Sequence, residues 1–214
     1  MTPCLTLDPA AASVVAALED DPFYRSICAV YADDIGRRRA VLEQYFTYSI
    51  LEGRSIGRCV HLADPARGVA VWLLPQASEV LSRSARQKRA FLEATLLPEG
   101  CANYYRILEF MSARAAKVVD GNAWYLSIIA VDPGAQGRGL GRKLLEPTIA
   151  EADGVAATCF LETFSPRSIS FYERLGFITR ARFAEPTTGA DYALMVRDPG
   201  LSLDRGQPTP PEPL

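Results

Sequence analysis

The stretch that decides the fold reads Val131-Asp132-Pro133-Gly134-Ala135-Gln136-Gly137-Arg138-Gly139-Leu140-Gly141-Arg142. An apolar run, residues 123–131, precedes it, and an amphipathic run, residues 140–152, follows it. This pattern predicts a strand, a glycine-rich loop and a helix in succession. Glycines at the start of a helix leave backbone N–H groups bare, and the helix dipole adds positive potential there. With two arginines beside it, the loop predicts a site for a ligand that carries phosphate.

The spacing of the glycines separates three kinds of phosphate loop. The dinucleotide fingerprint requires a third glycine three residues after the second, where this chain has Arg142. The Walker A pattern requires a lysine directly after its second glycine, where Leu140 stands. The pattern that remains is Gln-x-x-Gly-x-Gly, formed by Gln136, Gly139 and Gly141. A plain glycine-rich turn that caps a helix is the structural alternative.

A second motif follows in residues 160–177, which contain Leu-Glu-Thr, then Pro-Arg, then a short segment with a tyrosine closed by Leu-Gly-Phe. In this order the two motifs resemble the signatures of the GNAT superfamily of N-acetyltransferases, most clearly over residues 123–196. Within the superfamily the chain most resembles the puromycin N-acetyltransferase group. That likeness includes Ala-Val-Trp at 70–72, Ala-Trp at 123–124 and Pro147 inside a helix.

The resemblance implies an α/β (α+β) fold with a mixed, mostly antiparallel, seven-stranded sheet flanked by helices. The strands at 123–131 and 156–164 should be parallel and joined by a right-handed crossover through the helix at 140–152. We expect one domain over residues 1–198, in which a helical insert (76–122) precedes a coenzyme A-binding core (123–197). A proline-rich segment, residues 199–214, is expected to be disordered.

Patterning predicts the remaining elements. We expect a turn bracketed by Gly53 and Gly57, and a break at residues 98–100 between two helices of the insert. The expected strands are 4–7, 58–63, 68–74, 177–183 and 191–196, and the expected helices are 10–18, 36–52, 84–97 and 103–117.

Composition argues against several other classes of protein. The chain has 214 residues, 49% of them hydrophobic, and its formal charge of −2 shows no basic excess of the kind that nucleic-acid binders carry. No apolar stretch is long enough to span a membrane, and residues 1–4 lack the pattern of a signal peptide. Scattered cysteines fit reduced thiols, so we expect a cytoplasmic protein. His61 is the single histidine, which leaves little for a histidine-based metal site or catalytic triad.

The resemblance implies acetyl-coenzyme A as the cosubstrate and no metal. Its diphosphate is expected on the loop, its pantetheine arm along the end of the strand at 123–131, and further contacts on the second motif. Ser168 stands where many family members carry asparagine, which puts that contact in doubt. The expected cofactor-binding residues are Ile129, Ala130, Val131, Gln136, Gly137, Arg138, Gly139, Leu140, Gly141, Arg142, Ser165, Ser168 and Tyr172.

Acetyl transfer to an amine requires a neutral amine, a polarised thioester carbonyl and a stabilised thiolate. Tyr172 matches the tyrosine that many family members use as general acid; a core tyrosine is the structural alternative. Glu162, in an apolar strand, should have a raised pKa and suits the role of general base, or else fixes the following turn. Glu109 is a more distant candidate.

We therefore expect direct transfer of an acetyl group, in a ternary complex, to a primary amine of a small molecule. A non-catalytic acyl-coenzyme A sensor and a protein or peptide N-acetyltransferase are the alternatives. The protein should act as a monomer or homodimer. The acceptor is not identified by the sequence, although Phe23, Tyr24, Tyr45, Trp72, Tyr104 and Tyr105 either line an aromatic pocket or belong to the core.

Overall fold

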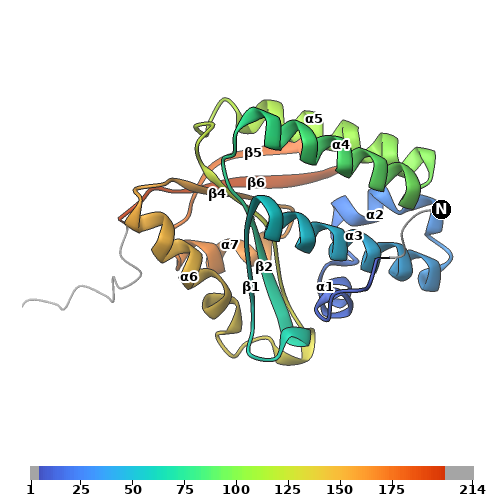
Figure 1. Cartoon of the computed structure of the whole chain (residues 1–214), viewed down its shortest axis with the longest axis horizontal. Helices are drawn as coiled ribbons and strands as arrows, with labels where there is room; N and C mark the ends of the chain where they lie inside the picture. The colour runs from blue at the N-terminus through green and yellow to red at the C-terminus, as the bar shows by residue number, and fades with distance from the viewer. Residues whose placement is uncertain (1–4, 201–214) are drawn as a thin grey trace, which may run out of the picture.

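One mixed sheet of six strands runs through the computed structural model, which describes residues 5–200. Its strands lie in the order β1-β2-β3-β4-β6-β5, and β3 and β4 are parallel whereas all other neighbours are antiparallel. Figure 1 shows β5 and β6 running horizontally and β1 and β2 running vertically, so the sheet is strongly twisted. The strands are β1 (Gly57–His61), β2 (Gly68–Leu73), β3 (Trp124–Val131), β4 (Cys159–Thr163), β5 (Ile178–Glu185) and β6 (Ala190–Arg197).

Helices cover both faces of this sheet (Figure 1). α1 and α3 pack on one face of β1 to β3, and α6 packs on the other; α7 and α5 pack against the half of the sheet that contains β5. α4 and α5 lie side by side and fill the predicted helical segment 76–122. The helices are α1 (Ala11–Leu18), α2 (Pro22–Ile27), α3 (Ile35–Ile56), α4 (Ser78–Thr95), α5 (Pro98–Ala115), α6 (Leu140–Gly154) and α7 (Pro166–Glu173).

Alternation along the central strands divides the core into two clusters. Val69 and Val71 of β2 point toward α1 and α3, whereas Ala70 and Trp72 point toward α6. A strand buried on both faces has no solvent side, which explains the almost continuous apolar run of β3. The predicted parallel pairing and its helical connection are confirmed, because α6 connects β3 to the parallel strand β4.

The prediction of seven strands was wrong, since the described residues form six. The expected first strand fails because residues 5–7 make no ladder, and the Leu7 side chain is 47% exposed. This segment instead docks on α3, where the backbone N–H of Asp8 donates to Thr47 Oγ1 at 3.1 Å. Cys4, and residues 201–214 of the expected disordered tail, lie outside the described residues.

The predicted boundaries of four elements were also wrong. α3 runs through Gly53 and enters β1 at Gly57 without a turn. Gly53 is required for packing, since a Cβ there would lie 2.5 Å from Val71 Cγ1. α5 begins at Pro98 instead of residue 103, because proline at the first helical position loses no hydrogen bond. α4 begins earlier than expected, at Ser78, and β4 is shorter than the predicted strand.

Over residues 5–200, no helix is both long and apolar enough to cross a membrane. The same part of the chain contains no group of three or more His, Cys, Asp or Glu side chains arranged to hold a metal ion.

Candidate active site

The site begins where β3 and β4 separate. The two strands pair only through Trp124, Tyr125 and Leu126, although β3 continues to Val131 and β4 to Thr163. A bulge precedes the gap, because Val71 and Trp72 of β2 face Ile128 and Leu126 and leave Ser127 as the extra residue of β3. Bulges bend a strand and increase its twist, so this one turns β3 away from β4. Past Leu126, the edge of β3 that faces β4 therefore has no ladder partner.

The glycine-rich loop starts at the end of β3 and is held by its own side chains. Asp132 accepts a hydrogen bond from the backbone N–H of Gly134 at 2.7 Å, and Gln136 Nε2 donates to the Val131 carbonyl at 3.0 Å. Gly137 (φ 76°) and Gly139 (φ 72°) have the left-handed backbone that glycine adopts without strain. Gly139 is the N-cap of α6 and supplies no side-chain cap, so the first amides of that helix face an open space.

A groove of about 540 Å³ runs along this loop. Eleven of the thirteen predicted cofactor-binding residues line it, and the structure thus brings the two sequence motifs together. Arg138 and Ser165 are absent from the lining: Arg138 is exposed, and Ser165 Oγ accepts from Ser168 Oγ at 3.1 Å. Sequence reasoning missed five further residues, namely Ala17, Leu18, Phe171, Arg174 and Leu175.

Packing between α6 and α7 fixes the inner wall of the groove. A Cβ on Gly141 would lie 3.0 Å from Phe171 Cζ, so glycine at this position allows the ring to approach the start of α6. α7 begins with Pro166 at its first position and is closed by Gly176 (φ 87°), and Phe177 beyond it is buried. This short helix presents Tyr172, whose side chain is only 8% exposed.

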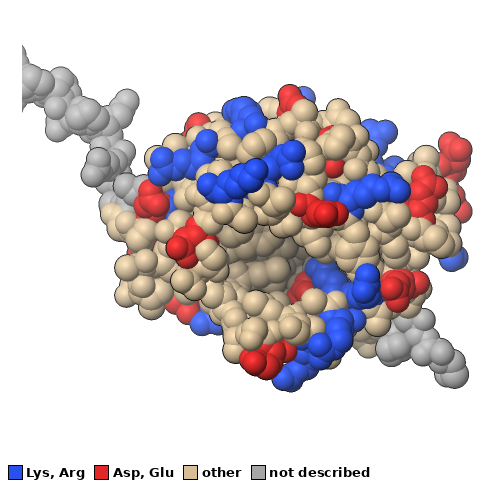
Figure 2. All heavy atoms as spheres, turned by 90° about the horizontal axis from the view of Figure 1, so that it is seen from above, with Lys and Arg blue, Asp and Glu red and all other residues tan. Residues whose placement is uncertain are grey.

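A second cavity, of about 580 Å³, lies on the other side of Tyr172. We name it the acceptor cavity, and its lining includes Phe23, Tyr45, Tyr125, Phe160 and Glu162. α4 and α5 flank it through Leu81, Lys88, Leu108 and Met111. Figure 2, which looks onto these helices from above, shows a central hollow with largely uncharged walls and charged side chains around its rim. The groove and the cavity share Leu18, Ile129 and Tyr172, so they meet there.

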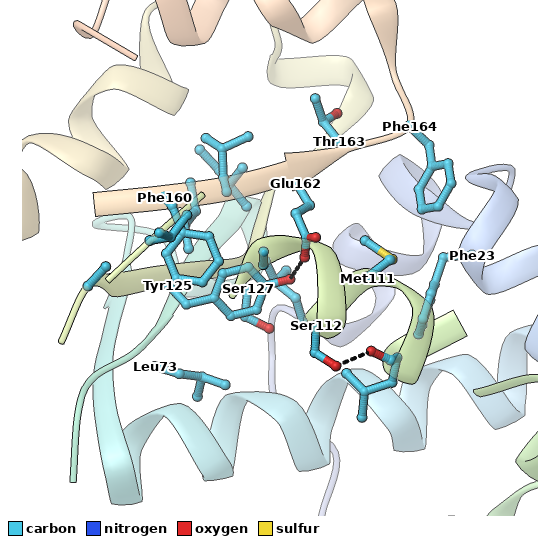
Figure 3. Close-up of a pocket in the computed structure, with 18 of the residues that line it drawn as sticks. Phe23, Leu73, Met111, Ser112, Tyr125, Ser127, Phe160, Glu162, Thr163 and Phe164 are labelled. Atoms are coloured by element: carbon cyan, nitrogen blue, oxygen red, sulfur yellow. Dashed lines mark hydrogen bonds between the residues drawn. The ribbon is translucent and has the colours of Figure 1, made fainter. Parts of the chain in front are cut away.

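The walls of the acceptor cavity are mainly apolar, and eight of the residues that line it are aromatic. Phe160 stacks on Tyr125 with ring centroids 4.7 Å apart, and Figure 3 shows Phe23, Met111 and Phe164 grouped to one side of this pair. Four of the six aromatic residues singled out in the sequence line this cavity, whereas two do not: Trp72 is fully buried and Tyr105 lies outside the lining. The four are Phe23, Tyr24, Tyr45 and Tyr104.

Glu162 extends from β4 into the acceptor cavity (Figure 3). Its Oε2 accepts a hydrogen bond from the Tyr125 hydroxyl at 3.4 Å, and its Oε1 is buried without a partner among the described residues. Burial raises the pKa of the Glu162 carboxyl to about 7, against the opposing effect of the Tyr125 hydrogen bond. A carboxyl with this pKa exchanges protons near neutral pH, as a general base must. Glu109 is exposed on α5 and lines neither cavity.

Tyr172 and Lys88 both keep their protons at neutral pH, because the pKa of each is raised. Burial, with a smaller effect of the Asp21 charge, raises the pKa of Tyr172, so its hydroxyl keeps its proton at neutral pH. Lys88 pairs with Glu52 at 2.5 Å, and its Nζ lies about 6 Å from the rings of Tyr45 and Tyr48. Its charge is thus balanced by a carboxylate behind the cavity wall.

Comparison with known proteins agrees with this geometry. The sequence profile of the Acetyltransferase (GNAT) family matches residues 74–177. An uncharacterized N-acetyltransferase of Schizosaccharomyces pombe is 24% identical over 213 residues, covering 95% of this chain and 84% of its own.

Solved structures share the fold. One is the crystal structure of histone acetyltransferase HPA2 and related acetyltransferase from Corynebacterium glutamicum, with a TM-score of 0.56 and 23% identity, covering 90% of this chain and 91% of that one. Another is arylalkylamine N-acetyltransferase 2 from Aedes aegypti, with a TM-score of 0.58 and 15% identity, covering 88% and 93%.

A splayed parallel strand pair, a glycine-rich loop at a helix N-terminus and a second motif with a buried tyrosine define a class of acyltransferases. The chain is an acetyltransferase of the GNAT type, and the family uses acetyl-coenzyme A as its cosubstrate. The narrower resemblance to the puromycin N-acetyltransferase group is not confirmed by these comparisons.

Proposed function

We propose that this enzyme transfers the acetyl group of acetyl-coenzyme A to the primary amine of a small, largely apolar molecule. The observation that carries the proposal is the junction of the two cavities at Tyr172 and Ile129. One cavity has a phosphate loop and the other has aromatic walls, so each suits one of two substrates that must meet at one point. Such an arrangement supports direct transfer within a ternary complex.

The groove has the chemistry that a diphosphate and a pantetheine arm require. Bare amides at the start of α6 and the positive end of its dipole suit phosphate oxygens, and Arg174 adds positive charge to the lining. A Cβ at Gly137 or Gly139 would meet nothing within 4 Å, so the loop leaves room for a bulky anion. The unpaired edge of β3 beyond Leu126 offers backbone groups to an extended amide-containing chain.

Bound acetyl-coenzyme A supplies a thioester carbonyl for the amine to attack. The roles of the side chains then follow from their protonation states. Glu162, with a pKa of about 7, takes a proton from the ammonium nitrogen, so an N–H bond breaks and a carboxyl O–H bond forms. Tyr172, protonated at neutral pH, donates its hydroxyl proton to the sulfur as the C–S bond breaks, and it takes back the second proton that the nitrogen loses as the C–N bond forms. We assign Glu162 as general base and Tyr172 as general acid.

The shape of the acceptor cavity favours a small molecule over a protein tail. Its walls come from α2, α4, α5 and the strands together, and its aromatic lining suits an aryl or alkyl amine. Arylalkylamine N-acetyltransferase 2 of Aedes aegypti, which shares the fold, is named for amines of this kind. Puromycin, suggested by the sequence resemblance, is an acceptor to include in the test.

A thiol-release assay tests the proposal directly. Purified enzyme and acetyl-coenzyme A are incubated with a panel of aryl and alkyl primary amines, puromycin, polyamines and lysine-containing peptides. We expect turnover with apolar primary amines and none with the variant Tyr172→Phe above about 1% of the wild-type rate. Tight coenzyme A binding without turnover on any amine would favour a sensor, and turnover on peptides alone would favour a protein acetyltransferase.

A further inference from the structure

Asp21 lies in the wall of the acceptor cavity and has no role in the mechanism above. In the sequence it reads only as part of Asp20-Asp21-Pro22, a break between helices. In the structure its Oδ1 caps α2 by accepting from the backbone N–H of Phe23 at 2.9 Å. Its own N–H donates to the Leu18 carbonyl at 2.9 Å. Because Leu18 lines both the groove and the cavity, Asp21 stands beside their junction.

Among the described residues at this junction, one carboxylate has no cation beside it and one hydroxyl has no hydrogen-bond partner. Among the described residues, no Lys, Arg or His side chain forms an ion pair with Asp21, and the Tyr172 hydroxyl has no hydrogen-bond partner although its side chain is more than nine-tenths buried. Burial raises the pKa of Asp21 to about 6, against the lowering effect of the Phe23 N–H. The Asp21 charge also contributes to the raised pKa of Tyr172, which places the two groups within electrostatic reach.

The charges that line the cavity do not balance. Lys88, the single basic residue of the lining, is already paired with Glu52. Asp21 and Glu162 remain as half-buried acids without a cation, and Asp120 adds a third, exposed acid. A carboxylate in such a place is costly unless a positive charge joins it. A ligand with an ammonium group would supply that charge.

We propose that Asp21 binds the ammonium form of the acceptor and holds its nitrogen beside Tyr172. Asp21 is then a positioning residue that selects cationic amines over neutral molecules of the same shape, while Glu162 receives the proton. The acceptor class becomes a primary ammonium on an apolar, aromatic body, with the ammonium at the junction and the body among the aromatic walls. This inference rests on the proposed function, since it assumes that the cavity receives the acceptor.

The variant Asp21→Asn separates the charge from the structural cap. Asparagine caps helices as well as aspartate does, so α2 should be retained. Asp20→Asn is the matched control, because Asp20 is exposed, lies 3.7 Å from Arg38 and lines neither cavity. The probes are 2-phenylethylamine and its neutral analogue 2-phenylethanol, with binding to the full-length enzyme measured by calorimetry in saturating coenzyme A at pH 7.5.

We expect wild-type enzyme to bind the amine more tightly than the alcohol. Asp21→Asn should weaken amine binding about 10- to 100-fold, the range for a charge-assisted hydrogen bond in a partly buried site. It should leave the binding of the alcohol and of acetyl-coenzyme A unaffected, and it should not lower the melting temperature, because removing a buried charge does not destabilise the fold. Asp20→Asn should change neither the binding of the two probes nor the binding of acetyl-coenzyme A.

Equal loss of both probes, or no loss of the amine, in Asp21→Asn would overturn the inference, as would a wild-type enzyme that does not prefer the amine. Amine binding that depends on Asp21 but leads to no thiol release would leave the inference standing and refute the proposed function. Unchanged turnover in Asp21→Asn, with an unchanged KM for the amine, would refute the inference and leave the proposed function standing.

Discussion

Replacing Glu162 by glutamine should stabilise the protein at pH 8 although it removes a residue of the site. The pKa of this carboxyl rises from its usual 4.5 to about 7 on folding, chiefly because burial disfavours its ionised form. Between these two pH values the unfolded chain has released the proton and the folded chain retains it. Wild-type stability therefore falls as pH rises from about 4.5 to about 7, and the full penalty applies above 7.

The size of the effect follows from the same shift. At about 1.36 kcal/mol per pH unit, the rise corresponds to roughly 3 kcal/mol. Because Glu162 is half-buried and faces a cavity, solvent screening reduces this to about 1–2 kcal/mol. Glutamine carries no charge and still accepts the Tyr125 hydrogen bond, so Glu162→Gln should gain about 3–6 °C in melting temperature at pH 8. The gain at pH 5 should be much smaller.

Thermal unfolding by circular dichroism at pH 5 and pH 8 measures this difference. Glu173→Gln is the matched control, because Glu173 is exposed on α7 and its replacement should shift the two melting temperatures equally. A Glu162→Gln variant that is less stable than wild type at pH 8 would refute the reasoning. So would a gain of the same size at both pH values, since that would show a carboxylate that loses no solvation on folding.

Three further predictions concern other parts of the molecule. Tyr172→Phe should lower kcat about 10²–10⁴-fold with little change in KM for acetyl-coenzyme A; a kcat within about threefold of wild type, with chemistry rate-limiting, excludes the acid role. Gly139→Asp should abolish coenzyme A binding in calorimetry. The control Gly139→Ala has the same backbone strain at φ 72° but adds no charge, so it should keep part of the binding. Equal loss of binding in both variants would assign the effect to backbone strain alone. Asp153→Asn should cost about 2–3 kcal/mol in urea unfolding, because fully buried Arg197 loses the opposite charge and one of its two hydrogen bonds to this side chain. The control Asp198→Asn, at an exposed pair with Arg180, should cost less than about 0.5 kcal/mol, and a similar loss in both variants would contradict the argument.

Local patterns in the sequence predicted most of the residues that line the groove, because its two motifs lie on short, contiguous segments. Glycines with positive φ, a proline at the first position of α7 and the apolar run of β3 each leave a local signal. The turn predicted at Gly53 was wrong because the close contact of this glycine with Val71 is tertiary. A glycine inside a helix indicates a break when the residue packed against it is unknown. The first strand failed for a related reason, since two or three alternating residues do not show whether a sheet edge is available.

The acceptor side was harder to predict because its residues come from elements far apart in the chain. Tyr24, Tyr104 and Phe160 line one cavity only when α2, α5 and β4 pack together. The sequence alone does not separate a pocket position from a core position for Tyr24 and Tyr104, and it does not single out Phe160. In the sequence Asp21 reads only as part of a break between helices, whereas in the structure it caps α2 and lies in the cavity wall. The raised pKa of Glu162 could be predicted from its apolar strand, whereas its Tyr125 partner on β3 could not.

The separation of β3 and β4 gives the sheet an edge in its own interior. Elsewhere a strand edge is exposed only at the rim of a sheet, where charged residues or a covering helix protect it from pairing with another chain. Here the free edge lies between two packed layers, where only a narrow extended chain can reach it. Backbone amides of β3 beyond Leu126 should therefore exchange with deuterium faster than those of the paired half, and coenzyme A should slow them. The exchange rate of one strand would thus report whether the enzyme is loaded, with no need for an acceptor.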